Sequence, residues 1–144
     1  MERNNHTVNF NIRGNSKGNF FCIPAWYNLP MILTKKEPFT SDEIEKLKET
    51  FDVYIKTVID LKYKICSAGC NRHFESERIL LDQGSNQEDL WGGGIDLETE
   101  TIDCNSFINI RPTQKNTGSE IQDGQIREEF NKLMRYFFKE IYGK

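Results

Sequence analysis

The chain has 144 residues, of which 37% are hydrophobic and 12% aromatic, and its formal net charge is −3. This length and composition fit one globular domain over residues 1–144 and exclude the disordered class. The acidic balance argues against a partner that is a nucleic-acid polymer, because such binders usually carry a basic face. No apolar run is long enough to cross a bilayer and the first residues lack the apolar core of a secretory signal, so we expect a cytoplasmic protein without a membrane partner.

The N-terminal part predicts a β-hairpin arm over residues 7–27. Val8, Phe10 and Ile12 alternate with polar residues, as on one face of a strand. Residues 14–18 are mostly of types that favour a turn, and residues 20–27 are expected to form a second strand rich in aromatics. So many exposed aromatics are expected to be buried against another surface, so this arm favours a homo-oligomer.

The next segment predicts a helix over about 40–52. Thr40 and Glu43 form a capping-box pattern, and Phe39 with Ile44 fits the hydrophobic staple around it. Residues 53–69 then alternate apolar and charged side chains, which indicates either one long strand or a hairpin that turns near Lys62.

The C-terminal half predicts a short helix, two strands and a long helix. The short helix covers 75–83, and the strands cover 90–96 and 101–110. A polar, mobile loop is expected over 113–122. A helix follows over about 124–142, with Asp123 as its N-cap and apolar residues on one face. The fold class is therefore α+β, an antiparallel sheet with an N-terminal hairpin and two main helices.

Candidate binding residues concentrate between Asn71 and Pro112, where amides, aromatics and glycines are interleaved. Phe74 and Trp91 are candidates to stack on a nucleobase, because their neighbours are polar. Arginine grips phosphate in a bidentate way, which makes Arg111 the first candidate for an anion and Arg78 and Arg127 weaker ones. The alternatives are core aromatics and surface arginines paired with carboxylates.

Catalytic and metal chemistry have thinner support. Because the sequence shows no secretory signal, we expect its four cysteines to be reduced thiols. Cys66, Cys70 and His73 could ligate zinc, but small buried thiols are the commoner outcome and we expect no metal and no cofactor. His73 and Glu75 would face the same side if they lay on a strand, which leaves a hydrolase open. We expect no catalytic residues.

Several motifs resemble a small bacterial domain family without an assigned activity, over the core from residue 31 to 144. They are Lys36-Glu37-Pro38, Val58-Ile59-Asp60, Gly69 to His73, an unbroken Leu-Leu-x-x-Gly-Ser-x-Gln-x-x-x-Trp-Gly signature from Leu80 to Gly92, and Ile108 to Pro112.

The same pattern is similar to the first-described type of phage anti-Thoeris proteins. That resemblance implies an oligomeric sponge that binds and sequesters a cyclic ADP-ribose isomer, and for some members cyclic oligonucleotides, without degrading them. It implies that Asn86 and Asn109 contact ribose or base edges, beside the aromatics and arginines above. The alternatives are a nucleotide or phosphoester hydrolase, and an antitoxin-like module that binds a protein through the hairpin.

Overall fold

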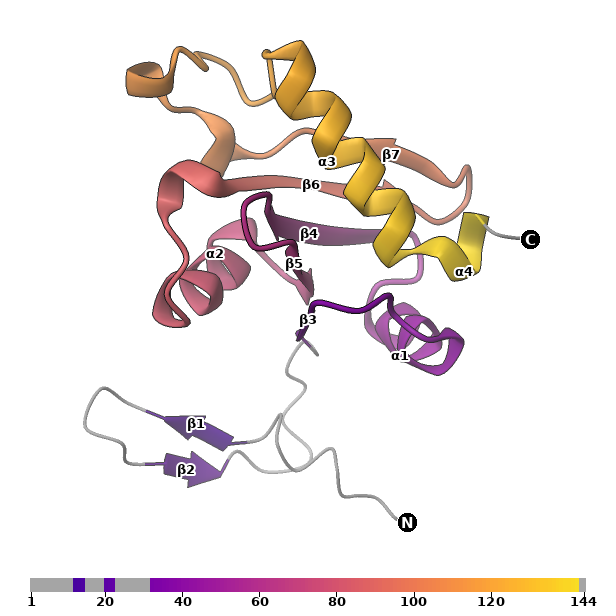
Figure 1. Cartoon of the computed structure of the whole chain (residues 1–144). Coiled ribbons are helices and arrows are strands. Elements are labelled where there is room, and N and C mark those ends of the chain that lie inside the picture. The colour runs from indigo at the N-terminus through magenta and orange to yellow at the C-terminus, as the bar shows by residue number, and fades with distance from the viewer. Residues whose placement is uncertain (1–11, 15–19, 23–31, 143–144) are drawn as a thin grey trace.

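A five-stranded antiparallel sheet organises the protein, in the order β3-β5-β4-β6-β7 (Figure 1). The computed structural model describes residues 12–14, 20–22 and 32–142. The strands are β3 (Leu33–Lys35), β4 (Tyr54–Asp60), β5 (Ile65–Cys70), β6 (Leu90–Asp96) and β7 (Thr101–Asp103). Helices α1 (Ser41–Thr50), α2 (His73–Asp82), α3 (Gly124–Phe137) and α4 (Lys139–Tyr142) accompany them. The α+β prediction is confirmed. No helix in the described part of the chain has the length and apolar character needed to span a membrane.

A separate two-stranded ribbon precedes this sheet. Strand β1 (Ile12–Gly14) pairs antiparallel with β2 (Phe20–Cys22), with Ile12 opposite Cys22. This part of the predicted hairpin is confirmed. Its turn and its outer residues lie outside the described residues, so the expected oligomerisation arm stays a prediction.

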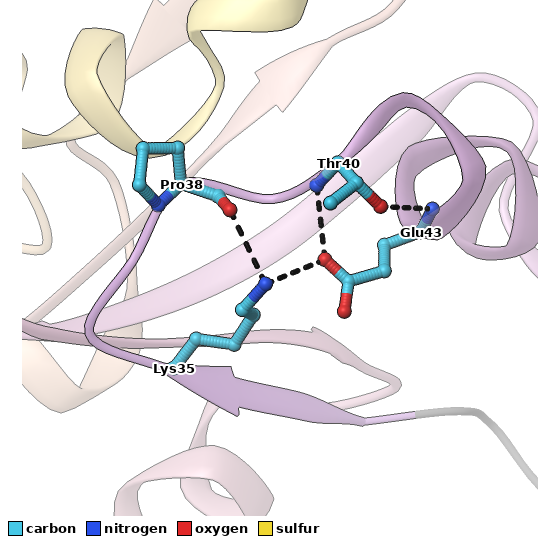
Figure 2. A network of polar contacts seen from close by, with 4 residues as sticks. All are labelled: Lys35, Pro38, Thr40 and Glu43. Carbon is cyan, nitrogen blue, oxygen red and sulfur yellow. Dashed lines mark hydrogen bonds and ion pairs between the residues drawn. The ribbon is translucent and has the colours of Figure 1, made fainter. Parts of the chain in front are cut away.

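The first helix begins as predicted, at a complete capping box (Figure 2). The Glu43 backbone N–H donates to Thr40 Oγ1 at 3.1 Å, and the Thr40 N–H donates back to Glu43 Oε1 at 2.9 Å. Lys35 adds a hydrogen bond to the same carboxylate at 2.8 Å and another to the Pro38 carbonyl at 3.2 Å. The end of β3 is thereby tied to the start of α1.

Residues 53–69 form the hairpin rather than one long strand. Strands β4 and β5 pair antiparallel, with Asp60 opposite Ile65. The buried Asp60 carboxylate accepts hydrogen bonds from the backbone N–H groups of Lys62 and Tyr63 at 2.8 and 2.9 Å, which closes the turn. Lys64 takes the left-handed conformation there, with a φ of 57°.

Helices cover both faces of the sheet. Successive strand residues point to opposite faces, so neighbours on β4 identify the two layers. Thr57 donates a hydrogen bond to Met134 Sδ of α3, whereas Val58 packs with Leu80 of α2. Helix α3 therefore lies on one face and α2 on the other, in agreement with the arrangement in Figure 1.

The main core lies between the sheet, α1 and the C-terminal helices. It holds the apolar face predicted for the last helix, including Phe130, Leu133, Met134, Phe137 and Ile141. Asp123 is the N-cap, as predicted, and accepts hydrogen bonds from two backbone N–H groups of α3.

The predicted single helix over 124–142 is wrong in one respect, because α3 and α4 break at Phe138. The Phe137 carbonyl accepts the Phe39 N–H at 2.9 Å, while the Ile141 N–H turns to the Phe138 carbonyl. The hydrogen bond from Phe39 thus takes the place of the one that Ile141 would make to Phe137 in a continuous helix.

Two C-terminal predictions are corrected. The strand expected over 101–110 ends at Asp103, and a 3₁₀ turn, η3 (Phe107–Asn109), follows. The loop expected to be mobile includes the 3₁₀ turn η4 (Pro112–Gln114) and is anchored by the buried side chain of Asn116. That amide donates to the carbonyls of Asn109, Gly118 and Glu120 and accepts the Gln122 N–H.

The short helix after β5 is confirmed, but it begins at His73 instead of Glu75. His73 and Glu75 therefore lie in the first turn of α2, and the expectation that they share a strand face is wrong. A further 3₁₀ turn, η2 (Gln87–Asp89), connects α2 to β6.

Candidate functional site

A groove opens on the face of the sheet that α2 covers. It encloses about 550 Å³ and is lined by Lys56 of β4, the residues 71–74 at the start of α2, and the residues 106–108 around η3. A smaller hollow of about 220 Å³ adjoins it and shares Lys56, His73, Ser106 and Phe107 with it, adding Asn105 and Ser119. The volume of the groove is in the range of small-molecule sites.

Lys56 supplies the half-buried positive charge of the groove, beside the exposed Arg72. It is half-buried, and within residues 32–142 its side chain makes neither an ion pair nor a hydrogen bond. Its Nζ lies 5.4 Å from the centre of the Tyr54 ring. The Tyr54 hydroxyl donates to Asp103 Oδ2 at 2.7 Å, so that carboxylate already has a donor. Lys56 is therefore available to an incoming anion.

Two exposed phenylalanines form the apolar walls. Phe74 is 53% exposed at the start of α2, and Phe107 is 85% exposed on η3. An aromatic side chain with that exposure contributes little to the core, and large exposed apolar groups often mark binding surfaces.

The turn that carries Phe107 is held firmly in place. Ser106 Oγ accepts the Ile108 N–H at 3.2 Å, and the Asn109 amide donates to the carbonyls of Gly92, Cys104 and Ser119. Phe107 is thus presented on a fixed platform, which lowers the entropy lost when a ligand packs against it.

His73 lines both hollows. Its Nε2 lies 2.7 Å from the Gly93 carbonyl, and because an oxygen can only accept, the ring donates from Nε2. Burial lowers the pKa of His73, with the nearby Lys56 charge acting in the same direction, so the imidazole is neutral at pH 7.

Glu75 does not pair with His73. Its Oε1 accepts the backbone N–H groups of Asn71 and Arg72 at 2.9 and 3.1 Å, which satisfies the start of the helix. The pair proposed for a hydrolase is therefore not joined by a hydrogen bond, and each member already has a structural partner.

The structure separates Trp91 from the groove. Trp91 is 2% exposed and belongs to the main core, so the expectation that its polar neighbours keep it at the surface is wrong. The guanidinium carbon of Arg111 lies 4.5 Å from its ring centre. The neighbouring polar residues point away, since Asn86 and Gln87 are themselves exposed.

Arg111 is also taken up by the fold. It is 7% exposed, and its guanidinium donates to the carbonyls of Ile108 at 3.0 Å, Gln87 at 2.7 Å and Leu90. Burial lowers the pKa of Arg111, while the charges of Glu77 and Asp89 counteract this. Its donors bind backbone, not a space where phosphate could enter.

The other predicted residues lie in various places. Asn109 is the buried last residue of η3, while Arg78 and Asn86 are exposed and lie outside the described lining of the groove. Arg127 donates from Nη1 to the Ile121 carbonyl at 2.7 Å and lies on α3, across the sheet. Of the predicted set, Phe74 alone lies in the groove lining that the structure describes.

The described residues contain no group of three or more His, Cys, Asp or Glu side chains that could hold a metal ion. Cys66, Cys70 and Cys104 are free thiols. Burial raises the pKa of Cys66 and Cys70, and it raises that of Cys104 to about 11. These thiols are protonated at neutral pH.

Sequence reasoning missed Lys56 and Phe107. Lys56 stands among alternating residues of a strand and carries no signal of its own. Phe107 belongs to an apolar run that predicts a strand. The signal in the sequence is Ser106, a residue type that favours the cap of a turn and argues against a strand continuing through Phe107.

The fold and the groove define a small α+β domain with a groove beside α2 on one face of the sheet. The chain belongs to the DUF5674 family, proteins of unknown function, whose family model matches residues 32–137. This confirms the resemblance to a domain family without an assigned activity. No curated protein and no solved structure matches the chain.

Proposed function

We propose that this protein binds a small nucleotide-like molecule in the groove and holds it without converting it. The observation that carries the proposal is the half-buried Lys56, which has no ion-pair partner within residues 32–142 and lies in a groove walled by the exposed Phe74 and Phe107.

A nucleotide carries an aromatic base and an anionic phosphate. Stacking on an aromatic side chain contributes about 1–3 kcal/mol per base. A charged hydrogen-bond donor such as the Lys56 ammonium contributes about 1.5–3 kcal/mol. Together these two interactions contribute about 2.5–6 kcal/mol, which corresponds to dissociation constants from the millimolar range down to tens of micromolar. The fixed η3 platform supports this binding.

The class of ligand follows from the sequence resemblance. We propose a cyclic nucleotide immune signal, a cyclic ADP-ribose isomer or a cyclic oligonucleotide, whose sequestration would block an anti-phage defence. A homo-oligomer and a cytoplasmic location are part of this proposal. The residues that support it are now Lys56, Phe74 and Phe107, in place of Trp91, Asn109 and Arg111.

A hydrolase remains the second candidate because His73 lines the groove. Its neutral ring has one nitrogen left to accept a proton. However, the Gly93 carbonyl, and not a carboxylate, orients the ring, because Glu75 is committed to the helix start. Burial also lowers the pKa of His73, which makes the ring a weaker base. Ligand fate separates the two candidates.

The test is a capture-and-release assay. The protein is incubated with a cyclic ADP-ribose isomer made by a TIR-domain enzyme, free ligand is quantified, and the protein is then denatured and the released ligand identified by chromatography. We expect free ligand to disappear and to be recovered intact. Recovery of a new species would make the protein an enzyme, and ligand that never disappears would rule out this signal.

Matched variants assign the binding to the groove. Phe107→Ala should weaken capture by about tenfold, in line with the loss of one stacking contact. Leu81→Ala is the control, since Leu81 is also an exposed apolar residue of the same face of the protein but lies outside the described lining. Equal capture by both variants would remove the groove from the proposal.

A further inference from the structure

We propose that the groove selects its ligand by charge: it takes an aromatic molecule with one or two negative charges, as in a phosphodiester or a monophosphate, and disfavours nucleoside triphosphates. This inference rests on the proposed function and specifies the ligand class of the same groove.

The charges that line the groove are few and of one sign. Among the described lining residues, Lys56 and Arg72 carry positive charge and none is acidic. Lys56 is half-buried, whereas Arg72 is exposed. Water screens an exposed charge more strongly, so Lys56 provides most of the attraction and Arg72 a smaller part. His73 adds no charge, because it stays neutral.

The two adjoining hollows suit two different parts of a ligand. The larger hollow has the apolar side chains of Phe74, Phe107 and Ile108, which suit a ring. The smaller hollow adds the amide of Asn105 and the hydroxyl of Ser119, which suit a sugar or a phosphoester. Lys56 lines both hollows, so one anionic group at their junction meets the ammonium while the ring packs on the aromatics.

Carboxylates beside the groove limit the total charge. Glu75 Oε1 binds the backbone of the lining residues Asn71 and Arg72. Asp103 accepts a hydrogen bond from the Tyr54 hydroxyl, and its charge acts on His73, which lines both hollows. Each phosphate added beyond the one at Lys56 is repelled by these two carboxylates, because like charges repel. The binding energy therefore stops growing after the first one or two charges.

The experiment compares ligands that share one base and differ in charge. Adenosine, cyclic AMP, AMP, ADP and ATP are titrated into the full chain by calorimetry, at constant ionic strength and with a chelator so that magnesium does not neutralise the phosphates. We expect cyclic AMP or AMP to bind about tenfold more tightly than adenosine, since a charged hydrogen bond is gained. ATP should bind more weakly than AMP. Affinity that rises steadily from adenosine to ATP would overturn the inference.

Variants tie the charge preference to Lys56. In Lys56→Gln the preference for AMP over adenosine should fall to the smaller part that Arg72 supplies, with the affinity for adenosine unchanged. Lys62→Gln is the control, because Lys62 is an exposed lysine in the β4–β5 turn. A preference that is as large in Lys56→Gln as in the unmodified protein also overturns the inference.

The failure of the inference is distinguishable from failure of the proposed function. If ATP binds best but Phe107→Ala weakens every ligand, the groove binds nucleotides and only its charge selectivity is refuted. If no adenosine compound binds, both the inference and the nucleotide class of the proposal are refuted.

Discussion

Asn109 and Gly92 form a two-way hydrogen-bonded pair. The Gly92 N–H donates to Asn109 Oδ1 at 2.8 Å, and Asn109 Nδ2 donates to the Gly92 carbonyl at 3.0 Å. Strand β7 pairs with β6 only from Gly94 to Asp96, so on the side of Gly92 away from β4 no strand of the described residues lies beside β6. The side-chain amide of Asn109 takes the place of a backbone peptide there and fixes η3 against the sheet.

Replacement of Asn109 by alanine should destabilise the fold. Asn109 is buried, and its loss leaves the N–H and the carbonyl of Gly92 without their partners. Each buried polar group left unsatisfied costs about 1–3 kcal/mol, so we expect the free energy of unfolding to fall by about 3 kcal/mol. Urea denaturation followed by circular dichroism measures it. Asn86→Ala is the control, because Asn86 is exposed and makes no side-chain hydrogen bond within the described residues. Equal stability of the two variants would contradict the structural role of Asn109.

Arg111→Ala should also lower stability, by about 2–3 kcal/mol, because the buried Leu90 carbonyl and the part-buried carbonyls of Ile108 and Gln87 lose a charged donor. The same substitution at the exposed Arg78 should change the free energy of unfolding by less than about 0.5 kcal/mol. Thermal or urea unfolding of both proteins tests this difference. A stable Arg111→Ala protein that no longer binds ligand would restore Arg111 as a phosphate contact, as its sequence context indicates.

Local signals in the sequence predicted the fold well. The capping box at Thr40 and Glu43, the N-cap Asp123 and the apolar face of α3 depend on neighbouring residues, and all three are present. Strand β6 has the predicted bounds, from Leu90 to Asp96. These features follow from short-range geometry, which a single sequence contains.

Long-range contacts explain what the sequence could not predict. Trp91, Asn109 and Arg111 combine aromatic, amide and guanidinium groups, and the same groups build either a ligand pocket or an internal polar network. Whether these groups form a pocket or an internal network depends on which backbone carbonyls come near Arg111. Two of those carbonyls belong to Gln87 and Leu90, which are more than twenty residues away in the sequence. Phe74 was predicted on chemistry and lies in the groove, whereas Lys56 and Phe107 enter it only because β4, α2 and η3 meet there.

The glycines of β6 should not tolerate side chains. A Cβ on Gly93 would lie 2.7 Å from the Phe130 ring and even closer to the Asp103 carbonyl. Overpacking of this kind costs about 1–3 kcal/mol, so Gly93→Ala should reduce the free energy of unfolding by at least that much. Gly124→Ala is the matched control, since a Cβ added there would meet nothing within 4 Å. A Gly93→Ala protein as stable as Gly124→Ala would show that β6 and α3 pack less closely than these distances require.

The buried position of His73 should make stability depend on pH. Burial lowers the pKa of His73 below its ordinary value of 6.5, so the unfolded chain takes up a proton at a higher pH than the folded protein does. The free energy of unfolding should then fall as the pH drops through about 6.5, and level off below the lowered pKa of the folded state. Urea denaturation at a series of pH values measures the slope. His73→Gln should lose this component of the pH dependence. An unchanged slope in His73→Gln would show that His73 is as accessible to protons in the folded protein as in the unfolded chain.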